Sequence, residues 1–122
     1  MLGLLITPSG LAVTRDVVTL EEMQACVDGD IEFVALQTIH GPVAMYLNAD
    51  GKFKNLPVNP FGTMLGLLCG GTAPEDRVLG NILLMGPADA DGRDTAIGLH
   101  SVAAIVDAVN CLLVWKHDEK AS

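Results

Sequence analysis

Residues 46–60 read Tyr46-Leu47-Asn48-Ala49-Asp50-Gly51-Lys52-Phe53-Lys54-Asn55-Leu56-Pro57-Val58-Asn59-Pro60. The run begins as the end of a strand and continues through Asp50-Gly51, a tight turn whose backbone favours a residue that tolerates positive φ. It ends in Asn59-Pro60, a pair that typically caps and begins a helix. One short stretch thus connects a strand to a helix, which indicates a fold that mixes the two.

The sequence around this stretch predicts further strands. Each run is rich in aliphatic or β-branched residues and is bounded by turn residues such as Gly41-Pro42. The predicted hairpins pair residues 2–6 with 11–14 and 31–36 with 43–48, and one more strand is predicted at 78–85. In the second hairpin, Glu32 and Asn48 alternate with apolar neighbours, so we expect both side chains to point outward.

Three helices are predicted from residues that typically cap a helix N-terminus. Thr19 followed by Glu22 fits a capping box, in which each side chain satisfies a backbone N–H of the other residue. A short buried helix should follow Asn59-Pro60, although its two interior glycines weaken it by about 1 kcal/mol each. Asp94 can cap a long helix reaching about Trp115, with a polar side opposite a broad apolar face that includes Leu99, Ile105 and Val109.

These elements predict an α+β fold: a small, mainly antiparallel sheet with the capped helix and the long C-terminal helix packed on it. A chain of 122 residues is expected to form one domain, residues 1–122. Within it, residues 1–93 would form the sheet-containing core and residues 94–117 the C-terminal helix.

The charge balance narrows the range of partners. Fifteen acidic residues against seven basic ones give a net charge of −8, which argues against direct binding to nucleic-acid phosphates. The acidic face could instead mimic DNA, although a solvated surface explains it more simply. Half of the residues are hydrophobic, so some apolar surface is expected to meet a partner, most simply another copy of the chain.

The cysteine pattern and the N-terminal residues together predict a cytoplasmic protein. Cys26, Cys69 and Cys111 are far apart and lie among apolar residues, so they are expected to be buried, reduced and inert rather than disulfide-bonded or metal-bound. Residues 1–6 lack the basic start of a signal peptide. The predicted long helix is too polar to span a membrane.

No catalytic or cofactor motif stands out, so we expect no cofactor. The acidic loop at residues 89–94 resembles a calcium loop, but its glycine stands at the wrong position and the bidentate glutamate is missing. His100 and Asp107 lie two helical turns apart and cannot form a catalytic pair within one straight helix. No metal site is therefore predicted.

The candidate ligand-binding residues lie in the opening stretch: Asn48, Lys52, Lys54, Asn55 and Asn59. Two ammonium groups and three amides could grip an anionic or nucleotide-like ligand near the N-terminus of the helix that begins at Pro60. The alternative is architectural. Asn48 and Asn59 would then be turn and cap residues, and the lysines would keep an edge strand soluble.

The same stretch resembles the signature of an uncharacterised family of small phage and actinobacterial proteins, Tyr-x-Asn-x-x-Gly-Lys-x-x-x-Leu-Pro-x-Asn. Further similar blocks lie at residues 20–24, 28–32 and 80–86. Two features depart from the family pattern: Gly62-Thr63 replaces the expected Ala-Thr, and the helix after Asp94 looks like an extension. The resemblance implies a mobile-element origin and a cytoplasmic setting, and it carries over no catalytic residue.

Three functions follow as hypotheses. The first is a non-enzymatic binding module of a phage or mobile element that sequesters or blocks a host molecule. The second is a homo-oligomeric sponge for a small anionic, nucleotide-like ligand, which predicts that Lys52 and Lys54 point into a cavity. The third and least favoured is a small enzyme with scattered catalytic residues, which predicts a cleft of convergent titratable groups.

Overall fold

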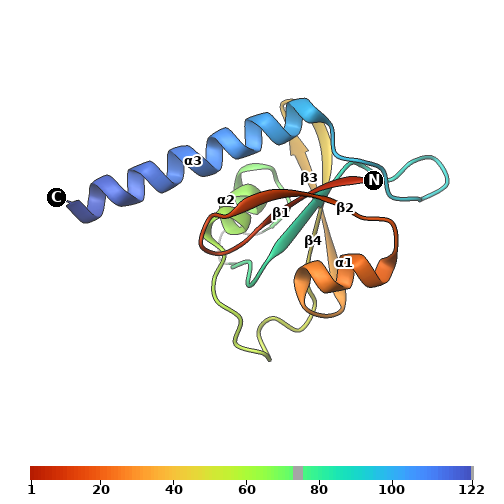
Figure 1. Ribbon diagram of the computed structural model, residues 1–122, viewed down its shortest axis with the longest axis horizontal. Helices are drawn as coiled ribbons and strands as arrows, with labels where there is room; N and C mark the ends of the chain where they lie inside the picture. Colours follow the sequence, from red (N-terminus) through yellow and green to blue (C-terminus); the bar gives the residue numbers. More distant parts are fainter. Residues whose placement is uncertain (73–75, 122) are drawn as a thin grey trace.

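The computed structural model describes residues 1–72 and 76–121, and for residues 115–121 only the backbone. Its helices are interspersed among the strands along the chain (Figure 1). In order they are β1 (Leu2–Ile6), β2 (Ala12–Asp16), α1 (Leu20–Val27), β3 (Ile31–Thr38), β4 (Gly41–Asn48), α2 (Pro60–Leu68), β5 (Ile82–Met85) and α3 (Leu99–Ala121). The predicted α+β class is confirmed.

The five strands form one open antiparallel sheet in the order β2-β1-β5-β4-β3. Both predicted hairpins are present, with β1 paired to β2 and β3 paired to β4. The late strand β5 joins the two hairpins by pairing with β1 on one side and β4 on the other. All four of its residues are buried, which explains why this strand is apolar throughout rather than alternating.

Helices cover both faces of the sheet. Met23 and Val27 of α1 pack on one face, against Leu83 and Met85 of β5. Phe61 of α2 and residues of α3 pack on the other face, against the alternate residues of the same strand. Because β5 contributes side chains to both layers, it sits at the centre of the core.

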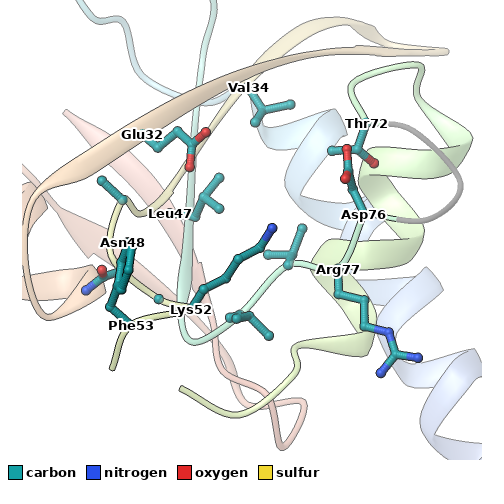
Figure 2. Close-up of a pocket in the computed structure, with 13 residues that line it drawn as sticks. Glu32, Val34, Leu47, Asn48, Lys52, Phe53, Thr72, Asp76 and Arg77 are labelled. Atoms are coloured by element: carbon teal, nitrogen blue, oxygen red, sulfur yellow. The ribbon is translucent and has the colours of Figure 1, made fainter. Parts of the chain in front are cut away.

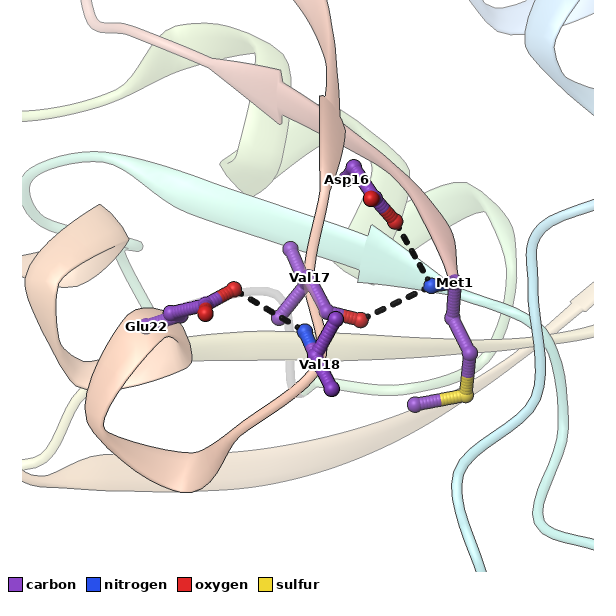
Figure 3. Close-up of polar contacts among 5 residues, drawn as sticks. All are labelled: Met1, Asp16, Val17, Val18 and Glu22. Atoms are coloured by element: carbon purple, nitrogen blue, oxygen red, sulfur yellow. Dashed lines mark hydrogen bonds and ion pairs between the residues drawn. The ribbon is translucent and has the colours of Figure 1, made fainter.

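Helix α1 begins with the predicted cap in a modified form (Figure 3). The Glu22 N–H donates to Thr19 Oγ1 at 3.2 Å, as in a capping box. The Glu22 carboxylate, however, accepts from the Val18 N–H at 3.0 Å, one residue earlier than the usual partner. The preceding residues join β2 to β1, because the Met1 nitrogen donates to Asp16 Oδ1 at 2.8 Å and to the Val17 carbonyl at 2.9 Å.

The glycines of α2 allow close packing. A Cβ on Gly62 would lie 2.8 Å from Val78 Cγ1, and a Cβ on Gly66 would lie 2.6 Å from Thr72 Oγ1. The helix therefore loses intrinsic helical stability but approaches the segment before β5 more closely. The prediction that α2 is buried holds on one side only, since Leu67 and Leu68 are exposed.

Helix α3 differs from its prediction at its start. It begins at Leu99 instead of Asp94, and Leu99, assigned to the apolar face, is exposed. Asp94 does not cap the helix, because its Oδ1 accepts a hydrogen bond from the Tyr46 hydroxyl of β4. Ile105 and Val109 are buried against the sheet as predicted. Beyond them the helix extends away from the sheet (Figure 1).

The cysteine prediction is wrong for one residue. Cys26 and Cys69 are partly buried, and burial raises the pKa of both thiols. Cys111 instead lies on the exposed side of α3. Its aliphatic neighbours in sequence suggested burial, but in a helix adjacent residues point in different directions.

Candidate functional site

A hollow of about 280 Å³ opens on the sheet face that carries α2 and α3, beside the edge strand β3 (Figure 2). Its walls come from the β3–β4 hairpin, from the turns after β4 and from the segment before β5. The lining residues are Glu32, Val34, Leu47, Asn48, Ala49, Gly51, Lys52, Phe53, Thr72, Asp76, Arg77, Val78 and Leu79. The volume lies just below the range of typical ligand pockets, which is roughly 300–1,000 Å³.

Lys52 extends from the turn into the space between the walls, with its ammonium group near the middle of the lining residues (Figure 2). Within the part of the chain that the structure describes, this ammonium has no hydrogen-bond or ion-pair partner. No carboxylate among the described residues therefore neutralises this positive charge by direct contact.

Charged side chains of both signs surround Lys52. The Glu32 carboxylate points from β3 toward the same space, and Asp76 lies on the other side of the ammonium group (Figure 2). Arg77 belongs to the rim, but its side chain extends away from the centre. Among the described lining residues two acids balance two bases, whereas the chain as a whole has a net charge of −8.

Asn48 is architectural in its hydrogen bonding, and the prediction that it points outward is wrong. The residue is only 3% exposed. Its Nδ2 donates to the Val27 carbonyl at the end of α1 at 2.9 Å, and its Oδ1 accepts from the Asp50 N–H at 2.7 Å. The side chain thus connects a helix end to the first turn after β4, which satisfies one of the carbonyls that a helix C-terminus leaves without a partner.

Lys54 lies outside the hollow. Its Nζ donates to the carbonyl of Asp28 at 3.2 Å, so this lysine also holds the C-terminal end of α1. Asn55 ends the turns with a positive φ of 52°, whereas Gly51, for which positive φ was expected, does not adopt it. Neither lysine lies on a strand, which removes edge-strand protection as their explanation.

Asn59 is fully buried, with 0% exposure, and all of its side-chain hydrogen bonds go to the backbone. Its Oδ1 accepts from the N–H groups of Phe61 and Gly62, which confirms the predicted helix cap. Its Nδ2 donates to the carbonyls of Ile6 and Gly80. These four bonds leave the side chain no capacity for a ligand.

The five candidate residues therefore do not converge on one site. Asn48 and Lys52 both line the hollow, but the polar atoms of Asn48 are already bonded. Sequence reasoning missed Glu32, Asp76 and Arg77 as lining residues. Strand alternation did predict that Glu32 points outward, and Glu32 is exposed. That pattern could not show that the side chain lines a hollow.

Metal binding and membrane spanning have no structural support in the described residues. Among them, no group of three or more histidine, cysteine, aspartate or glutamate side chains is placed to hold a metal ion. In the acidic loop, Asp89 Oδ1 accepts instead from the N–H groups of Asp91 and Arg93, both at 2.9 Å. None of the helices that the described part contains is both long and apolar enough to cross a bilayer.

The fold and the hollow define a small α+β protein with an antiparallel sheet covered on both faces. The chain belongs to the family described as "Domain of unknown function (DUF3846)", whose model matches residues 1–110. This match includes the first half of α3, so the helix after Asp94 is not the extension that the signature suggested. No curated protein and no solved structure matches the chain.

Proposed function

We propose that the protein is a non-enzymatic binding module that captures a small molecule carrying an anionic group, with Lys52 as the residue that contacts that group. The observation that supports this proposal is the Lys52 ammonium, which has no partner among the described residues and lies in a hollow with both apolar and charged walls. Lys52 therefore points into a hollow, as the ligand-pocket hypothesis requires of both lysines. Lys54 instead donates to the Asp28 carbonyl at the end of α1.

The surroundings of Lys52 favour ligand binding over a purely structural role. An exposed lysine without a partner contributes little to folding stability. A hydrogen bond from a charged donor to a bound anion contributes about 1.5–3 kcal/mol, and Val34, Leu47 and Leu79 offer apolar contacts beside it. Small-molecule sites likewise combine apolar wall residues with polar groups that fix the orientation of the ligand.

The wider setting of this proposal rests on the family signature. We propose that the protein acts in the cytoplasm as the product of a phage or related element, and that the captured molecule belongs to the host. We also propose that it works as a homo-oligomer, because α2 and α3 leave apolar side chains exposed on a surface away from the hollow.

Calorimetric titration with a panel of nucleoside monophosphates and with inorganic phosphate tests the proposal. At least one of these probes should bind the wild type, and Lys52→Ala should weaken that binding about ten-fold or more. Arg93→Ala is the matched control, because it removes the same charge from an exposed loop outside the hollow. The proposal fails if no probe binds, or if both variants bind as the wild type does.

A further inference from the structure

The hollow presents a second unpaired charge besides Lys52. The carboxylate of Glu32 enters it from β3, and among the described residues it has neither a hydrogen-bond nor an ion-pair partner. Glu32 and Lys52 also form no ion pair with each other, although they line the same space (Figure 2). Both side chains are exposed to solvent, so a ligand that occupies the hollow can meet a hydrogen-bond acceptor as well as a cation.

A purely anionic ligand fits this arrangement poorly. Inorganic phosphate would satisfy Lys52 but would place its charge in a space that also contains the carboxylates of Glu32 and Asp76. A ligand with an acidic group at one end and N–H donors at the other would satisfy both Lys52 and Glu32. Its donor end would give the carboxylate the hydrogen bonds that bulk water otherwise supplies.

The remaining lining favours a planar ring between these two ends. Val34, Leu47 and Leu79 supply apolar walls, and the ring of Phe53 at the rim is 91% exposed, so a flat ring can stack on it. A nucleobase combines such a ring with N–H donors at its edge. Guanine matches a carboxylate best, because two adjacent N–H donors can reach the two carboxylate oxygens, whereas uracil offers one.

We infer that the ligand of the hollow is a nucleoside monophosphate with an N–H-rich base, guanine above all. Its phosphate binds Lys52, its base edge donates to Glu32, and its ring stacks on Phe53. This inference rests on the proposed function, since it assigns a chemical class to the anionic ligand that Lys52 captures.

The test compares guanosine monophosphate, uridine monophosphate, guanosine and inorganic phosphate by calorimetric titration. Guanosine monophosphate should bind about ten-fold or more tightly than uridine monophosphate, and more tightly than guanosine or phosphate alone. Glu32→Gln should weaken the guanine nucleotide. It should not weaken the uracil nucleotide, because it removes a negative charge near the phosphate site. Glu21→Gln, an exposed acid on α1, is the matched control.

The outcomes distinguish a failure of the proposed function from a failure of the guanine assignment alone. If nucleotides bind through Lys52 with equal affinity for guanine and uracil, or if Glu32→Gln weakens neither, the proposed function stands and the assignment to a guanine nucleotide is wrong. If no phosphate-bearing probe binds, both are wrong. If phosphate alone binds as tightly as guanosine monophosphate, the base makes no contact and the inference fails.

Discussion

The side-chain amide of Asn48 donates to the carbonyl oxygen of Val27 at 2.9 Å and so joins the end of β4 to the end of α1. The same residue accepts from Asp50, where the turn segment toward Lys52 begins. A buried asparagine therefore fixes the start of that segment, while the lysine that it carries has no hydrogen-bond or ion-pair partner among the described residues.

Asn48→Ala is predicted to destabilise the protein, and Lys52→Ala is predicted not to. The first change leaves a buried carbonyl and an N–H without their partners, which should cost about 2–3 kcal/mol in the free energy of unfolding. The second is a surface change and should stay within about 0.5 kcal/mol. Urea denaturation measures both. Equal stability of Asn48→Ala and wild type would show that the asparagine is not the anchor described.

Gly62→Ala is predicted to destabilise α2, although alanine is the better helix former by about 1 kcal/mol. The new Cβ would lie 2.8 Å from Val78 Cγ1 and 3.1 Å from Ile82 Cγ2, so overpacking should outweigh that gain and leave a net loss of roughly 1–2 kcal/mol. Thermal unfolding checks this. Gly98→Ala is the control, since its Cβ would meet nothing within 4 Å. A Gly62→Ala variant more stable than the wild type would refute the close approach.

Cys111 is predicted to react with iodoacetamide faster than Cys26 and Cys69. Burial raises the pKa of the latter two thiols, so less of each is thiolate at pH 8 and their labelling should accelerate only at higher pH. Because burial disfavours the thiolate in the folded state, the free energy of unfolding should fall as the pH rises from the ordinary thiol pKa through the raised pKa values. Timed labelling with peptide mass spectrometry decides the order, and equal rates at all three sites would contradict it.

Self-association is predicted through the apolar groove between α2 and α3. The groove is lined by Phe61, Met64, Leu65, Leu68, Ile105, Ala108, Val109 and Leu112. Of these lining residues Leu68 is 75% exposed, so a two-fold partner could insert its own Leu68 into the groove. Light scattering at tens of micromolar should show an oligomer that Leu68→Glu dissociates. Ile39→Glu, at a 93% exposed turn, should leave the mass unchanged; a monomeric wild type would overturn the prediction.

Sequence patterns predicted the features that local interactions determine. The hairpin around Gly41, the cap at Thr19 and the Asn59-Pro60 helix start each depend on residues a few positions apart. Sequence patterns failed where a residue distant in sequence competes for the same group. Asp94 was predicted to cap a helix, but in the fold its carboxylate accepts a hydrogen bond from Tyr46. Strand alternation also misplaced Asn48, because the end of α1 covers that face.

The hollow could not be predicted because its walls come from three separate segments. Glu32 lies on β3, Lys52 on the turns after β4, and Arg77 just before β5. No spacing pattern connects such positions until the sheet brings them together. The lysine pair correctly predicted which segment contributes a charged residue to the site. Only the packed structure shows that Lys52 lines the hollow, whereas Lys54 binds the end of α1.

The most direct test of the central claim, ligand capture at Lys52, is to map binding by two-dimensional ¹H–¹⁵N NMR while guanosine monophosphate is added to the labelled protein. The account predicts that backbone signals shift in a group around the hollow, including Glu32, Leu47, Gly51, Lys52 and Leu79, and that Lys52→Ala suppresses these shifts. An absence of shifts at millimolar nucleotide, or shifts centred on the groove between α2 and α3, would contradict it.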